Sequence, residues 1–125
     1  MKLKRNRLKT YYHKVKSTKK DKEGGTYEVY GAAVSFSGEM WPAAGKIQAE
    51  MYGDRLSYIR NVRINGKYVI TTDRDGQVHY VYPSGLDIME SDGLCLYVSA
   101  SEEPDYKIIS AKPYSFLRLE AEKRK

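Results

Sequence analysis

The chain has 125 residues, 41% of them hydrophobic, and a net charge of +6, which bounds it to one domain with a core of modest size. Its single cysteine, Cys95, excludes an internal disulfide and predicts an intracellular protein in which Cys95 is a small buried hydrophobe. No apolar run approaches the ~20 residues of a membrane-spanning helix, and charged residues follow Met1, so we expect neither a membrane partner nor a signal peptide.

Positive charge is concentrated at the N-terminus. Met1–Lys22 holds ten Lys or Arg and one Asp, whereas the remainder holds 12 basic and 15 acidic residues. We therefore expect residues 1–23 to form a basic arm outside the folded body. Such an arm is commonly solvated, but it can also contact nucleic-acid phosphates or an acidic neighbour. The candidate contact residues are Lys4, Arg5, Arg7, Lys9, Lys14 and Lys16.

A long connection separates the first two strands predicted beyond the arm. Thr26–Phe36 and Arg55–Ile64 have the composition of strands, and Ser37–Asp54 between them is far longer than an ordinary hairpin loop of two to five residues. Its large apolar side chains favour an ordered element over a disordered one. Pro42–Met51 has helical character, so a short helix and an irregular loop are both compatible with the sequence. We expect this connection to project from the domain and to contact another chain.

Turn signals divide the rest of the chain into short segments. Asn65-Gly66 predicts a type I′ hairpin that joins Arg55–Ile64 to Lys67–Thr72, because both turn residues tolerate a positive φ. Asp73–Gly76 predicts another tight turn, into Gln77–Tyr82. Further strands are predicted at Leu94–Ser99 after Asp92-Gly93, at Tyr106–Ser110, and at Tyr114–Glu122 after the corner at Pro113.

The number and spacing of these segments predict an all-β fold. About seven short strands with turns between them favour a small antiparallel barrel or sandwich. We place this domain at residues 24–122, with the long loop or short helix inserted at residues 37–54. The end of the chain, Glu120–Lys125, is polar, so we expect it to fray, with residues 123–125 as a polar tail.

Patterns for catalysis or metal binding are missing from the sequence. His13 and His79 are isolated, and no pair of residues has the spacing of zinc ligands. Asp73–Gly76 is typical of a β-turn rather than a calcium loop, because no Glu occupies the twelfth position. Gly24-Gly25 is not followed by the Lys-Ser/Thr of a phosphate-binding loop. We therefore expect no enzymatic activity, no catalytic residue, no metal and no cofactor.

A pattern of glycines and aromatic residues does resemble a known family, the head-tail joining proteins of long-tailed bacteriophages and prophages. These are the head-closure, or stopper, proteins of the connector. The resemblance is carried by the glycine turn Gly24-Gly25, by YGAAVSFSGEMWPAAGKIQAEMYGDRLSYI at Tyr30–Ile59 and by DYKIISAKPYSFLRLEAEK at Asp105–Lys123. None of these segments is a catalytic signature.

The resemblance implies a structural virion protein. Members of the family are small β-barrels that assemble as homo-oligomeric rings, expected to match the symmetry of the portal. One side of the ring binds the portal or adaptor protein, and the other receives the tail terminator or tail tube. Packaged DNA is contacted non-specifically. The implied locations are the head-tail interface of the virion and, during assembly, the cytoplasm of the bacterial host.

The same resemblance assigns residues to the ring. In stopper-type members a loop between two strands projects into the DNA channel, and Ser37–Asp54 corresponds to that loop by position. Tyr52, Arg55 and Tyr58 would lie at its base or at subunit contacts. The implied channel-loop or partner-contact residues are Glu39, Met40, Trp41, Lys46, Gln48 and Glu50.

Two other functions are compatible with these features. One is a tail-terminator or tail-completion subunit, which co-purification with the tail-tube protein would identify. The other is a sequence-independent nucleic-acid-binding β-barrel that uses the basic arm. Steep salt dependence of DNA binding, lost on deletion of Met1–Lys22, would identify this second function.

Overall fold

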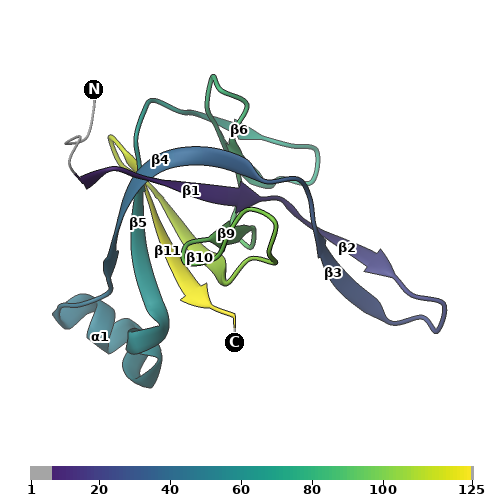
Figure 1. The fold of residues 1–125 in the computed structure, drawn as a ribbon, viewed down its shortest axis with the longest axis horizontal. Coiled ribbons are helices and arrows are strands. Elements are labelled where there is room, and N and C mark those ends of the chain that lie inside the picture. Colours follow the sequence, from purple (N-terminus) through teal and green to yellow (C-terminus); the bar gives the residue numbers. More distant parts are fainter. Residues whose placement is uncertain (1–6, 125) are drawn as a thin grey trace.

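The computed structural model describes residues 7–124, and within them six antiparallel strands form a closed barrel (Figure 1). The order of strands around the barrel is β1-β4-β5-β11-β10-β9. The predicted all-β class and antiparallel barrel are therefore confirmed. The barrel strands are β1 (Lys9–Lys14), β4 (Val34–Pro42), β5 (Ile59–Ile64), β9 (Gly93–Cys95), β10 (Tyr106–Pro113) and β11 (Leu117–Lys123).

Three inserted elements leave the barrel between its strands in the described part of the chain. The first is a hairpin between β1 and β4, made of β2 (Lys16–Lys20) and β3 (Thr26–Tyr30). The second, between β4 and β5, is the helix α1 (Lys46–Tyr52), followed directly by the 3₁₀ helix η2 (Gly53–Tyr58). Figure 1 shows the hairpin and α1 at opposite ends of the molecule. The third is a sheet of β6 (Val69–Thr72), β7 (Val78–Val81) and β8 (Asp87–Ile88).

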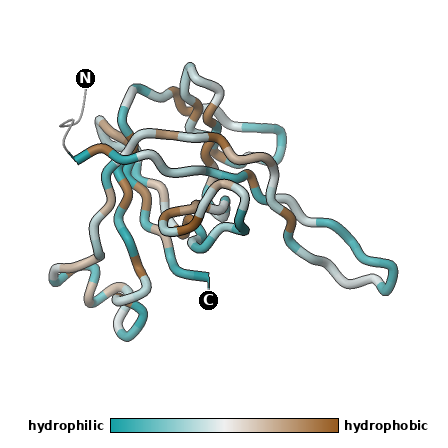
Figure 2. Tube along the Cα trace, in the orientation of Figure 1, coloured by the Kyte–Doolittle hydropathy of each residue, from teal (hydrophilic) through white to brown (hydrophobic). Residues whose placement is uncertain are grey.

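Alternating side chains fill the barrel. Leu117, Leu119 and Ala121 of β11 are fully buried, and the residues between them face outward or toward α1. Tyr80 and Ile88 join the same apolar cluster, so the three-stranded sheet covers part of the barrel core. Figure 2 shows hydrophobic residues concentrated in the barrel and hydrophilic residues at the hairpin tip. Each fully buried Leu or Ile contributes about 1.5–3 kcal/mol to folding, so this cluster is the main source of stability.

The basic segment at the N-terminus enters the barrel, which corrects the prediction of an arm over residues 1–23. Lys9–Lys14 is barrel strand β1, and Lys16–Lys20 lies in the hairpin. Tyr11 and His13 of β1 face the interior of the barrel, whereas Lys9 and Lys14 face the surface. A count of charges does not detect this alternation, which is the physical reason for the error.

A buried polar contact fixes β1 in place. His13 Nε2 lies 2.7 Å from Asp92 Oδ2, and both side chains are almost completely buried. The Asp92 carboxylate also accepts hydrogen bonds from the backbone N–H groups of Lys16, at 3.1 Å, and Met89, at 3.0 Å. Asp92 therefore joins the end of β1 to the turn between β8 and β9.

The predicted strand Thr26–Phe36 is two strands. Residues 31–33 separate β3 from β4, and β4 continues to Pro42. The prediction of a hairpin at Asn65-Gly66 is also wrong. β5 pairs with β4 and β11, whereas β6 pairs with β7, so the two strands that flank Asn65-Gly66 do not pair with each other. Gly66 does have a positive φ of 110°, but Asn65 does not have a positive φ, so the type I′ turn is not formed and the flanking strands diverge.

The turn predicted at Asp73–Gly76 is confirmed. It joins β6 to β7, with a hydrogen bond of 3.0 Å from Asp73 N to Gln77 O and a φ of 79° at Gly76. The strand predicted at Leu94–Ser99 is shorter than expected, since β9 ends at Cys95. Cys95 is 1% exposed, which confirms the prediction that it is a small buried residue.

The C-terminal segment belongs to the barrel instead of fraying at Glu120. Glu120 is 1% exposed and Ala121 is fully buried, and both lie in β11, which extends to Lys123. The prediction failed because the buried position of Glu120 depends on partners distant in sequence. Among residues 7–124, no helix is long and apolar enough to cross a membrane.

Candidate functional site

The segment predicted to project, Ser37–Asp54, has two parts with different structures. Its first part continues β4, so Glu39, Met40 and Trp41 pair with Arg63, Val62 and Asn61 of β5 and do not lie in a loop. Met40 packs against the barrel core. The channel-loop position expected for these three residues is therefore corrected, because β4 is long enough to include them. Lys46, Gln48 and Glu50 lie on α1.

Glycines set the limits of α1. The helix begins after Gly45, whose φ is 91°, and ends at Gly53, whose φ is 54°. Of its residues, Gln48 is the buried one. The Gln48 side-chain amide donates to Asn61 Oδ1 and to Glu120 Oε2, each at 2.7 Å, and its oxygen accepts from Ala44 N at 3.1 Å. Gln48 thus anchors the helix to the barrel and is not an exposed contact residue.

Glu120 is the centre of this buried polar network. Burial favours its protonated form, but hydrogen bonds from Gln48 and Tyr52 and the ammonium of Lys112 outweigh burial and lower the pKa of Glu120. Lys112 Nζ lies 3.4 Å from Glu120 Oε1. The pKa of Tyr52 is raised to about 12 by burial, by its hydrogen bond to Glu120 and by the charge of that carboxylate. The network is charged and structural at neutral pH, and it fixes α1 on the barrel surface.

The face of α1 next to Gln48 carries exposed apolar side chains. Ile47 is 77% exposed and Met51, one turn later, is 56% exposed. Together with Tyr114 they line one side of a depression of about 470 Å³, whose other lining residues include Gln48, Lys112, Arg118 and Glu120. We call Ile47, Met51 and Tyr114 the helix patch. Apolar side chains gathered in this way are typical of a surface that binds another protein.

The predicted subunit-interface residues differ in their availability. Arg55 makes two hydrogen bonds to the Glu122 carboxylate, at 2.7 and 2.6 Å, and its guanidinium lies 5.7 Å from the centre of the Tyr52 ring. Tyr52 and Arg55 are therefore tied to the barrel. Tyr58 is 53% exposed and is available to a partner.

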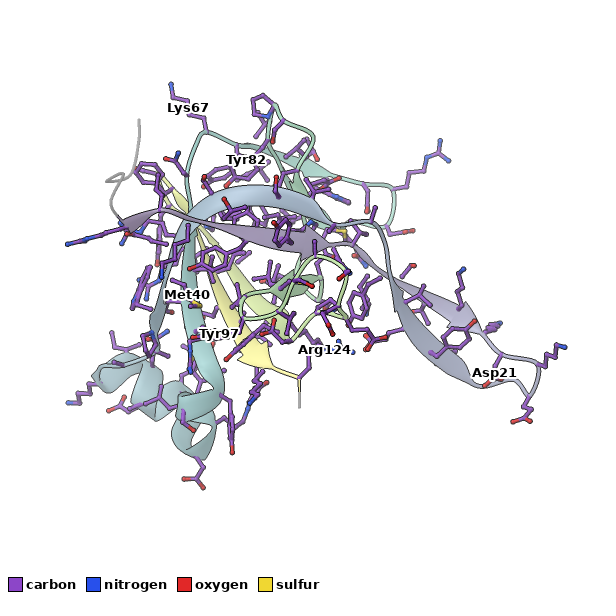
Figure 3. All side chains as sticks on the ribbon, in the orientation of Figure 1. Asp21, Met40, Lys67, Tyr82, Tyr97 and Arg124 are labelled. Carbon is purple, nitrogen blue, oxygen red and sulfur yellow. The ribbon has the colours of Figure 1, made fainter. Side chains whose placement is uncertain are left out.

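The hairpin β2–β3 is exposed on both faces of most of its length. Its register runs from Lys16 opposite Tyr30 to Lys20 opposite Thr26. Asp21 closes the tip, where its carboxylate accepts from the backbone N–H groups of Glu23, at 3.0 Å, and Gly25, at 2.8 Å. Figure 3 places Asp21 at this tip, far from Met40 and Tyr82 in the body of the molecule.

The predicted basic contact residues do not form one surface. Lys14 donates to the backbone oxygen of Glu102 at 2.7 Å, and Lys16 forms an ion pair with Glu28 at 3.4 Å. Lys9 is exposed on β1, and Arg7 lines a depression that also includes Trp41. Lys4 and Arg5 lie outside the described residues.

Two charged groupings were missed by sequence reasoning. His79 lies between Asp73 and Asp87, 2.8 Å from each, and hydrogen bonds to these carboxylates raise its pKa above the ordinary value. Arg63 and Arg118 both lie over the ring of Trp41, at 5.3 and 5.4 Å from its centre. Neither grouping is visible without strand register. No group of His, Cys, Asp and Glu in residues 7–124 has the geometry to hold a metal ion.

Comparison with known proteins identifies no relative. The chain matches no protein-family model, no curated protein and no solved structure. Its function therefore has to be inferred from the surfaces described above.

Proposed function

We propose that this chain is a structural subunit of the head-tail connector of a long-tailed phage or prophage. In this proposal it forms a ring below the portal and adaptor proteins, closes the DNA channel and receives the tail. The observation that carries the proposal is the placement of two exposed surfaces at opposite ends of one small barrel, the hairpin β2–β3 and the helix patch (Figure 1). The resemblance of Tyr30–Ile59 and Asp105–Lys123 to head-tail joining proteins supports the same function.

The helix patch is suited to the contact between subunits. A closed ring needs heterologous contacts, in which one surface of a subunit meets a different surface of the next. Ile47 and Met51 offer apolar area on a helix that Gln48 and Glu120 hold rigidly to the barrel. Rigid apolar anchors of this kind bind without a large loss of conformational entropy.

The hairpin is suited to closing the channel. Like α1 and η2, it lies between two barrel strands and projects from the barrel. A two-stranded hairpin is marginally stable by itself in water, so it is the element best able to change position when DNA passes. Residues 19–23 at its tip carry three lysines and two carboxylates, which would permit DNA passage without tight binding.

Cryo-electron microscopy of DNA-filled, tailless heads incubated with the purified protein tests the proposal. We expect a ring coaxial with the portal, with the helix patch between neighbouring subunits and the hairpin directed at the channel axis. Folded protein that does not bind heads would contradict the proposal. Binding to the tail tube instead would assign the chain to the tail-terminator or tail-completion subunits.

A further inference from the structure

The three-stranded sheet has an open edge at β6. In the order β6-β7-β8, β6 has β7 on one side and no strand on the other among the described residues. All of β6 is exposed, with Val69 at 63% and Ile70 at 50%. Proteins usually protect an open edge with charged residues, proline or a bulge, and Val69–Thr72 has none of these. This edge is therefore able to pair with another strand.

The alternation of hydrogen bonds shows which backbone groups of β6 are free. Asp73 N donates to Gln77 O at 3.0 Å, directly beyond the ladder between β6 and β7. In an antiparallel pair every second residue bonds to the same neighbouring strand, so the residues two and four positions before Asp73 also bond to β7. The N–H and C=O groups of Ile70 and Thr72 therefore point to the open edge, where no described strand lies.

The barrel does not cover the sheet as far as β6. In the strand register Ile70 lies opposite Tyr80, and Tyr80 lies opposite Ile88, so the three side chains share one face of the sheet. Tyr80 and Ile88 are buried in the barrel core, but Ile70 is half exposed. The cover that the barrel gives to this face thus ends before β6. A further strand has space beside β6 and would cover Ile70.

We propose that β6 pairs antiparallel with β6 of a second copy of this chain, about a two-fold axis at Thr71. In this register Ile70 lies opposite Thr72 of the partner subunit, so the outward backbone groups of both residues gain hydrogen bonds. Thr71 lies opposite the partner's Thr71, and Thr-Thr pairs stabilise neighbouring strands. The contact is isologous, because both subunits use the same surface.

The charges that flank β6 favour a second copy in this orientation. Lys67 precedes the strand, Asp75 follows it, and both are exposed. Figure 3 shows Lys67 directed away from the body of the molecule. Antiparallel pairing brings Lys67 of one subunit to the end of the contact that carries Asp75 of the partner subunit, whereas parallel pairing would bring two lysines together. The contact uses neither the helix patch nor the hairpin, so it does not depend on the ring proposed above.

An exchange of charge at Thr71 tests the two-fold contact. Sedimentation velocity of the full chain over a concentration series measures the equilibrium between monomer and dimer. T71K and T71E each place two like charges opposite each other, so each variant should dimerise at least about tenfold more weakly than the wild type. An equimolar mixture of the two variants should recover the dimer, because opposite charges then face each other. Melting temperatures by circular dichroism verify that both variants are folded.

Amide hydrogen exchange locates the contact within the strand. The N–H groups of Ile70 and Thr72 should become protected as the dimer forms, whereas the N–H of Thr71, already bonded to β7, should change little. The matched control is T10K, which adds the same charge at an exposed threonine of β1, a barrel strand with neighbours on both sides. We expect T10K to dimerise like the wild type.

Three results would overturn the proposal. The first is a wild type that stays monomeric at the highest concentration, and the second is a T71K variant that dimerises as the wild type does. The third is a loss in both variants without recovery in their mixture, which would mean that the copies meet at another surface. Ring formation on heads by T71K is measured separately, so failure of the β6 contact and failure of the connector proposal are distinguishable.

Discussion

At the scale of single residues, Gln48 determines whether α1 stays on the barrel. We expect Gln48→Ala to lower the free energy of unfolding by about 1–3 kcal/mol, because Asn61 and the buried Glu120 each lose a hydrogen bond of 2.7 Å. Urea denaturation measures this change. The matched control is Ile47→Ala on the same helix, which should alter stability by less than about 0.5 kcal/mol because Ile47 is 77% exposed. Equal losses for the two variants would contradict a specific stabilising role of the Gln48 hydrogen bonds.

His79 makes the stability of the three-stranded sheet depend on pH. Hydrogen bonds to Asp73 and then Asp87 raise the pKa of His79, and the pKa of Asp73 is lowered chiefly by its hydrogen bond to His79. Because the folded pKa of His79 exceeds the unfolded value of about 6.5, its stabilising effect is complete below that value and is lost as pH rises through the folded pKa. The lowered pKa of Asp73 keeps that carboxylate charged in the same window.

Thermal unfolding of the wild type and of His79→Gln over a pH series tests this coupling. We expect the difference in melting temperature to be largest near pH 6 and to shrink as pH rises through the folded pKa, which NMR titration of His79 determines. A difference that does not change with pH would mean that His79 contributes only packing.

At the scale of secondary-structure elements, the hairpin should be separable from the barrel. Ser17 and Val29 lie opposite each other, so an Asn-Gly turn can replace residues 18–28 and join them directly. The root contacts remain, including Lys16 N with Asp92 and the Arg124 guanidinium over Tyr30 at 4.8 Å. We expect this variant to have an almost unchanged melting temperature by circular dichroism. We also expect it to form rings that bind to heads but do not retain the DNA. Full retention of DNA by such rings would exclude the hairpin as the closing element.

Local chemistry determined how far each element could be predicted. The turn at Asp73–Gly76 was predictable because its hydrogen bonds form within five residues, and the end of α1 at Gly53 was predictable because glycine tolerates positive φ. Asn65-Gly66 has the same kind of chemistry, but its flanking strands find different partners in the barrel and in the small sheet. The buried positions of β1 alternate, but its sequence does not show this, because Tyr12 between them is the same residue type as Tyr11 and the buried His13 is polar.

The candidate surfaces depend on contacts that a single sequence does not reveal. Gln48 and Glu120 are polar residues at buried positions, so hydrophobicity does not predict their burial. They are 72 residues apart in the chain, so the sequence does not predict the hydrogen bond between them. The grouping of Arg63 and Arg118 over Trp41 requires the register of β4, β5 and β11 together. An aromatic residue near basic ones in sequence would be a usable signal, but Trp41 is far in sequence from Arg63 and Arg118.

At the scale of the whole molecule, the placement of the helix patch and the hairpin at opposite ends separates assembly from channel closure (Figure 1). A variant that cannot assemble is not incorporated into the ring. A variant with a defective hairpin is incorporated and leaves the channel incompletely closed. The variant I47E/M51E introduces charge into the helix patch but leaves the buried Gln48 anchor intact. It should fold, fail to form rings on heads, and act as a recessive variant in mixtures with wild-type protein.

The chain with residues 18–28 replaced should behave in the opposite way. Since it keeps the helix patch, it should enter mixed rings, and a single short hairpin in a ring leaves a gap in the closed channel. Retention of DNA by heads, measured as resistance to nuclease across a mixing series, should therefore fall more steeply than the fraction of wild-type subunits. In the parallel series with I47E/M51E, retention should follow the amount of wild-type protein alone. Identical curves for the two series would mean that assembly and closure reside on the same surface, which would contradict the division of labour proposed for this barrel.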